Sequence, residues 1–226
     1  MLLWLKNLLD PGWYARQVDV APDVTSWMPR QGDARPSRMV CFPLRQDEFV
    51  LVAPFLPKRG VLEQLKQMGR VGWIVVYDEQ QLAAARYLKR TLPIAAILST
   101  AAMSRVHQDC ESLGRFPAGY RLGIHALYGT AGLGVAINYR TVRRTTLFLS
   151  HVVQPKSGKV WAAARRLRRS PDYRLDQLSE HLSELGSGRS KITIIFDGDQ
   201  VWDMRSEEWI ELCQEAAKTV GADLNE

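Results

Sequence analysis

Residues 72–98 read GWIVVYDEQQLAAARYLKRTLPIAAIL, and the class of fold follows from the order of three segments within this stretch. Residues 73–77 form an unbroken run of bulky apolar side chains, which is typical of a buried β-strand. Residues 80–91 are rich in Ala, Leu, Lys and Arg, which favour a helix, and Pro93 ends that helix. Residues 95–98 are a second apolar run. The order strand, helix, strand predicts an α/β protein.

Segments of the same kinds continue on both sides of this stretch. Before it, residues 39–43 and 49–53 read as two strands joined by the polar turn 45–48, which is the pattern of a β-hairpin, and residues 61–68 read as a short helix. After it, we expect helices at 101–113, 159–169, 175–185 and 206–219, and strands at 121–127, 134–139, 145–150 and 191–196. The sequence contains no internal repeat and no low-complexity segment.

The length and composition of the chain fit one globular domain. The chain has 226 residues, of which 46% are hydrophobic. Its first 37 residues differ from the rest, because prolines at positions 11, 22, 29 and 36 prevent a long helix there. Trp4, Trp13 and Trp27 would anchor this segment, since a floating tail does not usually carry three tryptophans. We therefore expect an N-terminal lead-in over residues 1–37, packed on a single domain over residues 38–226.

The sequence favours a soluble, cytoplasmic protein. No stretch reaches the roughly 18 consecutive apolar residues of a membrane-spanning helix, and the opening segment carries Lys6 and then Asp10. That segment also lacks the basic start and the cleavage site of a secretory signal. The three cysteines, Cys41, Cys110 and Cys213, are odd in number and far apart, so we expect neither a disulfide framework nor a structural zinc site.

The order of elements, together with four local segments, resembles the metallo-β-lactamase family. In that family a buried strand leads into a T-H-x-H-x-D-H loop, an Ala-rich helix, a proline and a further strand, which is similar to residues 72–98 here. A G-H-T-x-G segment of the family is similar to residues 129–134, a strand ending in Gly-Asp to residues 147–151, and a strand ending in His-Gly to residues 196–199. The resemblance covers residues 38–220 and implies an αββα sandwich of two packed sheets.

The metal ligands of the family are not preserved in this correspondence. The positions of the four loop ligands hold Asp78, Gln80, Leu82 and Ala83, and the three later ligand positions hold Thr130, His151 and Asp197. Two zinc or iron ions need imidazoles and a bridging carboxylate, and neither a leucine nor an alanine side chain can bind a metal. We therefore expect no dinuclear centre, no cofactor and no catalytic residue. The polar residues would then mark a vestigial pocket of Asp78, Gln80, Thr130, His151 and Asp197.

Two further readings of these residues stay open. Asp78, His151 and Asp197 form a plausible ligand set for one divalent ion in a remodelled hydrolase, although polar residues at strand ends more often bond to loop backbone. His107 and Cys110 are three residues apart in the helix expected at 101–113, so we interpret them as a surface helix face. His125 and His181 are interpreted as structural. The sequence has no nucleophile elbow, P-loop or dinucleotide-binding motif.

The formal net charge is +6, and much of the excess lies in Arg165, Arg166, Arg168 and Arg169, with Arg140, Arg143 and Arg144 upstream. This cluster is either a polyanion-binding surface or the solvated side of the helix expected at 159–169. The leading hypothesis is a non-catalytic protein of metallo-β-lactamase-like fold that acts by binding or assembly. Its partner would be an unidentified protein or small molecule, a polyanion at the arginine cluster, or a second copy of the chain.

Overall fold

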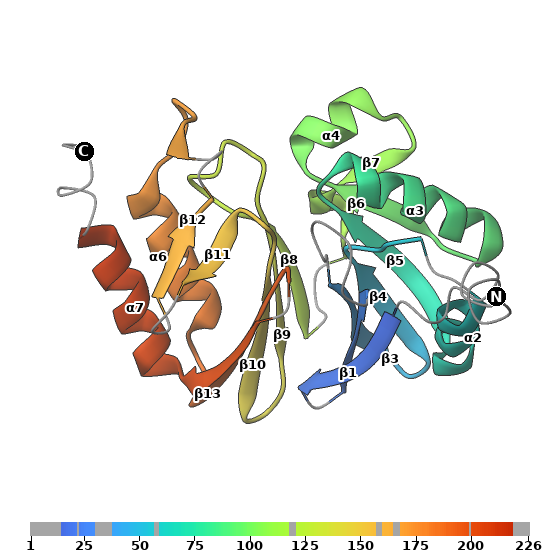
Figure 1. The fold of residues 1–226 in the computed structure, drawn as a ribbon, viewed down its shortest axis with the longest axis horizontal. Helices are drawn as coiled ribbons and strands as arrows, with labels where there is room; N and C mark the ends of the chain where they lie inside the picture. Colours follow the sequence, from blue (N-terminus) through green and yellow to red (C-terminus); the bar gives the residue numbers. More distant parts are fainter. Residues whose placement is uncertain are drawn as a thin grey trace, which may run out of the picture. The chain divides into compact units, whose positions relative to one another are not determined.

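The computed structural model of this chain describes residues 15–21, 23–29, 38–56, 59–117, 121–156, 160–164, 168–198 and 200–218. By their internal contacts the residues divide into two compact units. Unit 1 comprises Met1–Ser99 and Met103–Arg115, and unit 2 comprises Thr100–Ala102 and Phe116–Glu226. Each unit contains one large mixed sheet with helices beside it (Figure 1), which confirms the expected α/β class.

Unit 1 is built on a seven-stranded sheet whose strands follow one another in chain order. The first four strands are antiparallel, and β4 to β7 are parallel. The strands are β1 (Ala15–Ala21), β2 (Val24–Pro29), β3 (Met39–Arg45), β4 (Glu48–Val52), β5 (Arg70–Val76), β6 (Ala96–Ser99) and β7 (Cys110–Ser112). Between them lie the helices α2 (Arg59–Met68), α3 (Glu79–Thr91) and α4 (Ala101–Val106), and a 3-10 turn, η2 (Leu113–Arg115), follows β7.

The core of unit 1 joins the sheet to its helices. Leu82, Ala85 and Leu88 recur at helical spacing on α3 and are fully buried in the same cluster as Ile74 of β5 and Leu65 of α2. Burial of apolar area of this kind is the main favourable contribution to folding. It fixes the first turn of α3 directly after β5, where the side chains of residues 78–81 emerge.

Unit 2 is built on a five-stranded sheet in the order β14-β13-β10-β9-β8, in which only the β10–β13 pair is parallel. Its strands are β8 (Leu122–Ala126), β9 (Val135–Arg140), β10 (Arg144–Leu149), β13 (Lys191–Phe196) and β14 (Val201–Arg205). A separate hairpin pairs β11 (Val153–Lys156) with β12 (Val160–Ala163).

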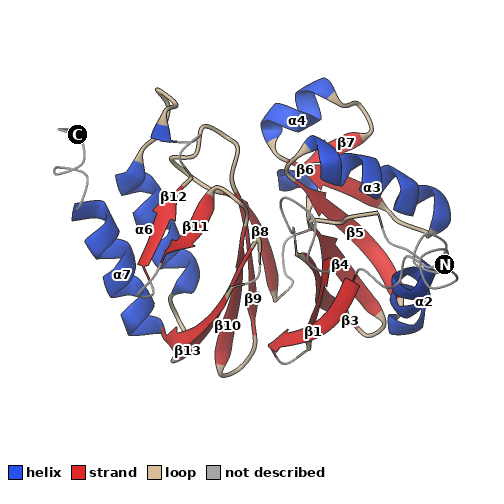
Figure 2. Cartoon of the chain, in the orientation of Figure 1, coloured by secondary structure: helices blue, strands red, loops and turns tan. Residues whose placement is uncertain are grey.

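Helices α6 (Leu175–Gly186) and α7 (Ser206–Lys218) lie side by side in unit 2 (Figure 2). The indole nitrogen of Trp209 on α7 donates to the carbonyl of Leu182 on α6 at 2.9 Å. Both residues are fully buried, in one cluster with Leu147 of β10 and Ile194 of β13. The two helices therefore cover one face of the five-stranded sheet.

Most of the expected elements are present, and two expected helices are wrong. The helix expected at 101–113 ends at Val106, and residues 110–112 form β7 instead, because Cys110 pairs with Ile97 of β6. In the helix expected at 159–169, residues 160–163 form β12. There the aromatic ring of Trp161 is 2% exposed within the core of unit 2, so strand pairing and burial prevail over local helix preference.

The N-terminal lead-in contains two strands that the sequence did not predict, β1 and β2. Trp27 of β2 is fully buried in unit 1, whereas Trp4 and Trp13 lie outside the described residues. Whether residues 38–226 behave as one domain stays a prediction. The three cysteines are buried free thiols. Within the described ranges, no helix is long and apolar enough to cross a membrane.

Candidate functional site

The loop between β5 and α3 carries the first residues of the expected pocket. Asp78 is the N-cap of α3, and its carboxylate accepts a hydrogen bond of 2.9 Å from the backbone N–H of Gln81. The side-chain oxygen of Gln81 in turn accepts from the backbone N–H of Tyr77 at 3.0 Å. These two bonds satisfy backbone donors at the start of the helix, where no carbonyl of a preceding turn is available. One oxygen of the Asp78 carboxylate is thus engaged in capping the helix.

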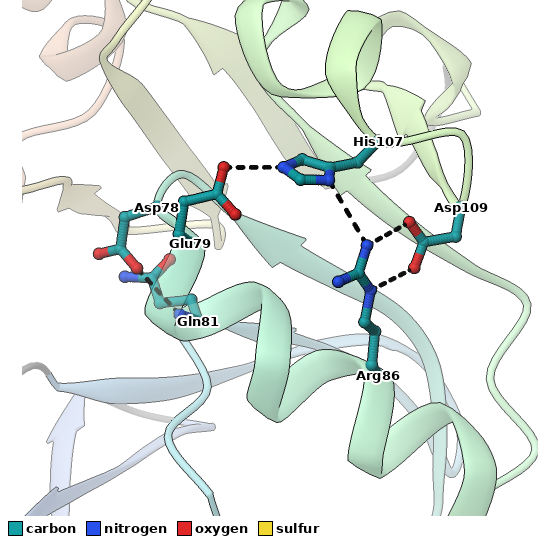
Figure 3. A network of polar contacts seen from close by, with 6 residues as sticks. All are labelled: Asp78, Glu79, Gln81, Arg86, His107 and Asp109. Carbon is teal, nitrogen blue, oxygen red and sulfur yellow. Dashed lines mark hydrogen bonds and ion pairs between the residues drawn. The ribbon is translucent and has the colours of Figure 1, made fainter.

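A network of four polar side chains connects α3 to the loop after α4 (Figure 3). Arg86 of α3 forms two hydrogen bonds to the carboxylate of Asp109, 2.6 Å from Nε and 2.8 Å from Nη2. The hydrogen bonds from Arg86 lower the pKa of Asp109 to about 2. Both side chains are close to half exposed, so solvent screens much of their attraction.

His107 completes this network, which we call the α3 polar network (Glu79, Arg86, His107, Asp109). Its Nε2 lies 2.7 Å from Oε1 of Glu79, and its Nδ1 lies 3.5 Å from Nη2 of Arg86. A guanidinium group can only donate, so Nδ1 of His107 accepts and the ring hydrogen resides on Nε2, which donates to Glu79. Both nitrogens of the imidazole are therefore engaged.

The geometry of the α3 polar network suits a fastening role better than proton transfer. A general base needs a ring nitrogen within reach of a substrate proton, and neither nitrogen of His107 is available while these contacts persist. The neighbouring thiol of Cys110 is a poor nucleophile, because burial raises its pKa and the negative charge of Asp109 adds to this effect. The network instead ties residues 107–109, which precede β7, to the outer side of α3.

A second polar cluster lies in unit 2, around His181 of α6. The backbone N–H of Tyr128 donates to Nδ1 of His181 at 3.1 Å, and the ring of Tyr128 stacks on the imidazole with 4.2 Å between centroids. His125 meets the same ring edge-on at 6.0 Å and bonds through Nε2 to Oδ1 of Asn138 at 3.0 Å. We call these residues the histidine cluster. Burial lowers the pKa of both imidazoles.

The other residues of the expected pocket are distributed over the two units. Gln80 is exposed on the first turn of α3 in unit 1. Thr130 of unit 2 is fully buried, and its hydroxyl donates to the carbonyl of Leu127 at 2.7 Å and accepts from the N–H of Gly134 at 3.0 Å. Thr130 therefore holds its own loop together. Its hydroxyl has no proton left to donate to a ligand.

His151 and Asp197 are brought to the same end of one sheet. They follow β10 and β13, which are parallel neighbours, and the N–H of Asp197 donates to the carbonyl of Leu149 at 3.0 Å. Both side chains are half-buried. Asp78, the third member of the single-ion set, belongs to unit 1.

The residues at the ligand positions do not fit a dinuclear metal centre. Leu82 is fully buried in the core of unit 1 and Ala83 is exposed, and neither has a donor atom. Asp78 and Thr130 have donors that already serve the backbone. Over the part of the chain that the structure describes, no group of three or more His, Cys, Asp or Glu side chains is arranged to hold a metal ion.

The arginine cluster lies partly outside the described residues. Arg165 and Arg166 lie outside the described residues. Arg168 and Arg169, which follow β12, are exposed. Residues 160–163 form a strand, so no single helix covers 159–169, and the solvated-face reading of the cluster stays a prediction. Binding of a polyanion by these arginines stays a prediction.

Four residues of the polar clusters escaped the sequence analysis: Glu79, Arg86, Tyr128 and Asn138. The run 107–110 was interpreted as a helix face, which is wrong, since His107 and Asp109 lie in a loop and Cys110 in a strand. A signal was present in Asp109, a poor helix former next to the polar Gln108. Nothing in the sequence pairs Arg86 with Asp109 across 23 positions.

The sequence matches no protein-family model and no curated protein. Several solved structures are similar in fold. The metallo-β-lactamase FIM-1 from Pseudomonas aeruginosa in its mono-zinc form is 12% identical, with a TM-score of 0.64, over 92% of this chain and 96% of that chain. DIM-1 metallo-β-lactamase exposed to ceftazidime is 11% identical, with a TM-score of 0.61, over 89% and 97%.

A third similar structure is a metallo-β-lactamase from Erythrobacter litoralis with β-mercaptoethanol in its active site. It is 10% identical to this chain, with a TM-score of 0.59, and the match covers 92% of this chain and 97% of that chain. At such identities the likeness establishes the fold alone. The chain has the metallo-β-lactamase fold, as the sequence predicted.

Proposed function

We propose that this chain, which has the metallo-β-lactamase fold, acts by binding or assembly and has no hydrolytic activity at the place of the family's metal centre. The observation that carries the proposal is the buried leucine at position 82. Where the correspondence with the family requires a carboxylate ligand, Leu82 is 0% exposed and packs in the core of unit 1. A ligand cannot be restored there without opening that core.

Two further positions support the same proposal. The carboxylate of Asp78 caps α3, and the hydroxyl of Thr130 is used on both its donor and its acceptor side within the 127–134 loop. A metal competing for these groups would remove bonds that satisfy buried or helix-terminal backbone. The donor groups left over are too few for the ligands of two ions, each of which usually takes four or more.

A single-ion hydrolase is the alternative that one observation favours. His151 and Asp197 lie at the ends of adjacent parallel strands, where the active sites of open α/β sheets usually form. One imidazole and one carboxylate from these strand ends would hold a single divalent ion weakly, and the sequence hypothesis adds Asp78 of unit 1 as a further ligand. A water bound to such an ion would supply the nucleophile of the alternative reaction.

Elemental analysis and reporter substrates test the proposal directly. The full chain is purified without added metal, and its zinc, iron and manganese are measured. We expect well under one equivalent of any metal and no turnover of β-lactam, thioester or phosphodiester reporters above a heat-denatured control. A stoichiometric metal, together with turnover that His151→Ala removes, would replace the proposal by the single-ion hydrolase.

A further inference from the structure

At one end of the large sheet in unit 2, four strands carry a basic residue and a fifth, β8, is directly preceded by one. Across the sheet, the strand register aligns Arg205 of β14 with Lys191 of β13, and Lys191 with Arg144 of β10. Arg140 ends β9 opposite Thr145 of β10, and its N–H donates to the carbonyl of Arg121, which precedes β8, at 2.9 Å. Residues far apart in the sequence are thereby gathered along one border of the sheet. Arg144, Lys191 and Arg205 share one face, and Arg140 is on the other face with Thr145.

Two loop arginines extend this border. Arg143 lies in the turn between β9 and β10, and Arg189 precedes β13. Nε of Arg189 donates to the carbonyl of Thr141 at 2.9 Å, so its side chain is held against the β9–β10 turn. We call the complete set the strand-end row, which consists of Arg121, Arg140, Arg143, Arg144, Arg189, Lys191 and Arg205.

Most of the positive charge of the strand-end row is not neutralised. Arg144 pairs with Asp203 at 2.7 Å and Arg205 with Glu208 at 2.8 Å, and Glu207 is a third carboxylate at the start of α7. The other five cations are exposed and form no ion pair with any residue in the described ranges: Arg121, Arg140, Arg143, Arg189 and Lys191. These five exposed cations outnumber the carboxylates at the border and give it a positive potential that attracts anions.

The form of the strand-end row matches a linear polyanion. Neighbouring strands lie about 4.8 Å apart, so five strands span about 19 Å. One strand of a nucleic-acid duplex carries a phosphate about every 3.4 Å along the axis, so this span faces about six phosphates. Six of the seven cations are arginines, whose planar fork binds phosphate oxygens in pairs.

A nucleic acid fits this surface better than a membrane. Membrane-surface elements combine basic residues with several large apolar side chains that enter the lipid. At this border the only exposed large apolar residue among those described is Val142, in the β9–β10 turn. Phosphate contacts without base contacts position a nucleic acid but do not read its sequence.

We propose that the strand-end row binds the phosphate backbone of nucleic acid without base specificity. This inference goes beyond the proposed function and does not depend on it, because the row lies wholly in unit 2 and uses none of the residues at the former metal positions.

Fluorescence anisotropy of the full chain with labelled oligonucleotides of about 20 nucleotides tests the inference. Duplex and single-stranded DNA and RNA of unrelated sequences are titrated between about 50 and about 200 mM salt. If about five phosphates are contacted, affinity should fall about 500-fold over this interval, with little dependence on sequence. A sequence preference above about 100-fold, or no binding at the lower salt concentration, would refute the proposal.

Two variants with the same change in charge locate the site. Replacing Arg121, Arg140 and Arg143 by Gln should reduce the slope of log affinity against log salt by about three. The matched control replaces Arg90, Arg105 and Arg115, which are exposed arginines of unit 1, and should leave the slope nearly unchanged. Equal losses in both variants would mean that net charge alone drives binding, which overturns the proposal.

Replacement of Arg165, Arg166, Arg168 and Arg169 by Gln tests the other basic cluster. Loss of binding in that variant, with none in the Arg121, Arg140, Arg143 variant, would assign the site to that cluster and overturn the proposal. A change of the same three row residues to Lys should retain most of the salt slope, which distinguishes lost charge from lost folding. Binding only to phosphatidylserine vesicles would contradict the choice of nucleic acid.

Discussion

Leu82 lies in the core of unit 1, at a position for which the resemblance to the family implies a ligand. The residue faces inward from α3 at the spacing of Ala85 and Leu88, and all three are buried together. An ionised carboxylate at this point would lose its hydration and gain no partner, because its neighbours in the cluster are apolar. The same substitution on the exposed side of α3, at Ala83, would remain in water.

Leu82→Asp should therefore lower the free energy of unfolding by about 3–5 kcal/mol. Ala83→His, the matched control, should change it by less than about 0.5 kcal/mol. Urea unfolding followed by tryptophan fluorescence measures both variants. Near-native stability of Leu82→Asp would mean that position 82 remains able to hold a ligand, and the proposed function would lose its main support.

His181 has a second residue-specific consequence, which concerns pH. Its Nδ1 accepts from the N–H of Tyr128, so protonation at Nδ1 removes that bond and places a charge near His125. Burial, and then His125, lowers the folded-state pKa of His181 below that of the unfolded chain. The unfolded state then binds more protons, so this contribution to stability is complete above about pH 6.5 and is lost as pH falls through the folded pKa.

The free energy of unfolding should thus decrease between about pH 7 and about pH 5. His181→Asn, whose amide oxygen can accept from the same N–H, should flatten the decrease. His125→Asn should flatten it to a smaller extent, because it removes only the second cause of the lowered pKa of His181. Urea unfolding at several pH values measures the slope. An identical slope in His181→Asn and the parent chain would exclude His181 as its source.

The elements that the sequence predicts best are those whose pattern is local. Residues 80–91 repeat apolar side chains at helical spacing, and α3 forms there. The strands that the sequence missed depend on tertiary contacts. Cys110 becomes part of β7 by pairing with β6, and Trp161 becomes part of β12 by pairing with β11 and by burial in the core of unit 2. The α3 polar network was missed for the same reason, since Arg86 and Asp109 meet only after the chain has folded.

The pair Arg86–Asp109 should control how tightly β7 is held. Asp109→Asn removes the negative charge from the contact with Arg86, which has two hydrogen bonds and lies next to the three-residue strand β7. The strand should therefore open more often. Hydrogen exchange of the amides of residues 110–112 should accelerate, while the amides of β5 should exchange as before. Glu63→Gln, which breaks an exposed pair within α2, is the control. Unchanged exchange at residues 110–112 would leave the pair without a structural role.

For the whole molecule, the metallo-β-lactamase fold is formed without the residues that the sequence comparison places at the family's metal-ligand positions. At 12% identity to FIM-1 the apolar pattern and the order of elements are sufficient to specify the same architecture. Fold could be predicted from such patterns. Function could not, because it depends on which donors are left free, and the bonds of Asp78 and Thr130 become visible only in three dimensions.

If no metal is part of the native protein, its thermal stability should not respond to chelation. An ion that binds the native state only, supplied at about 100 times its dissociation constant, stabilises by about 2.7 kcal/mol. For a chain of 226 residues this corresponds to a rise in melting temperature of about 5–10 °C. We expect changes below about 1 °C when chelator, zinc or manganese is added, in the parent chain and in His151→Ala alike.

A fall of several degrees on chelation that His151→Ala reproduces without chelator would establish a single-ion site at His151. The single-ion hydrolase would then be the better-supported proposal, because a bound divalent ion with an open position can activate a water as nucleophile.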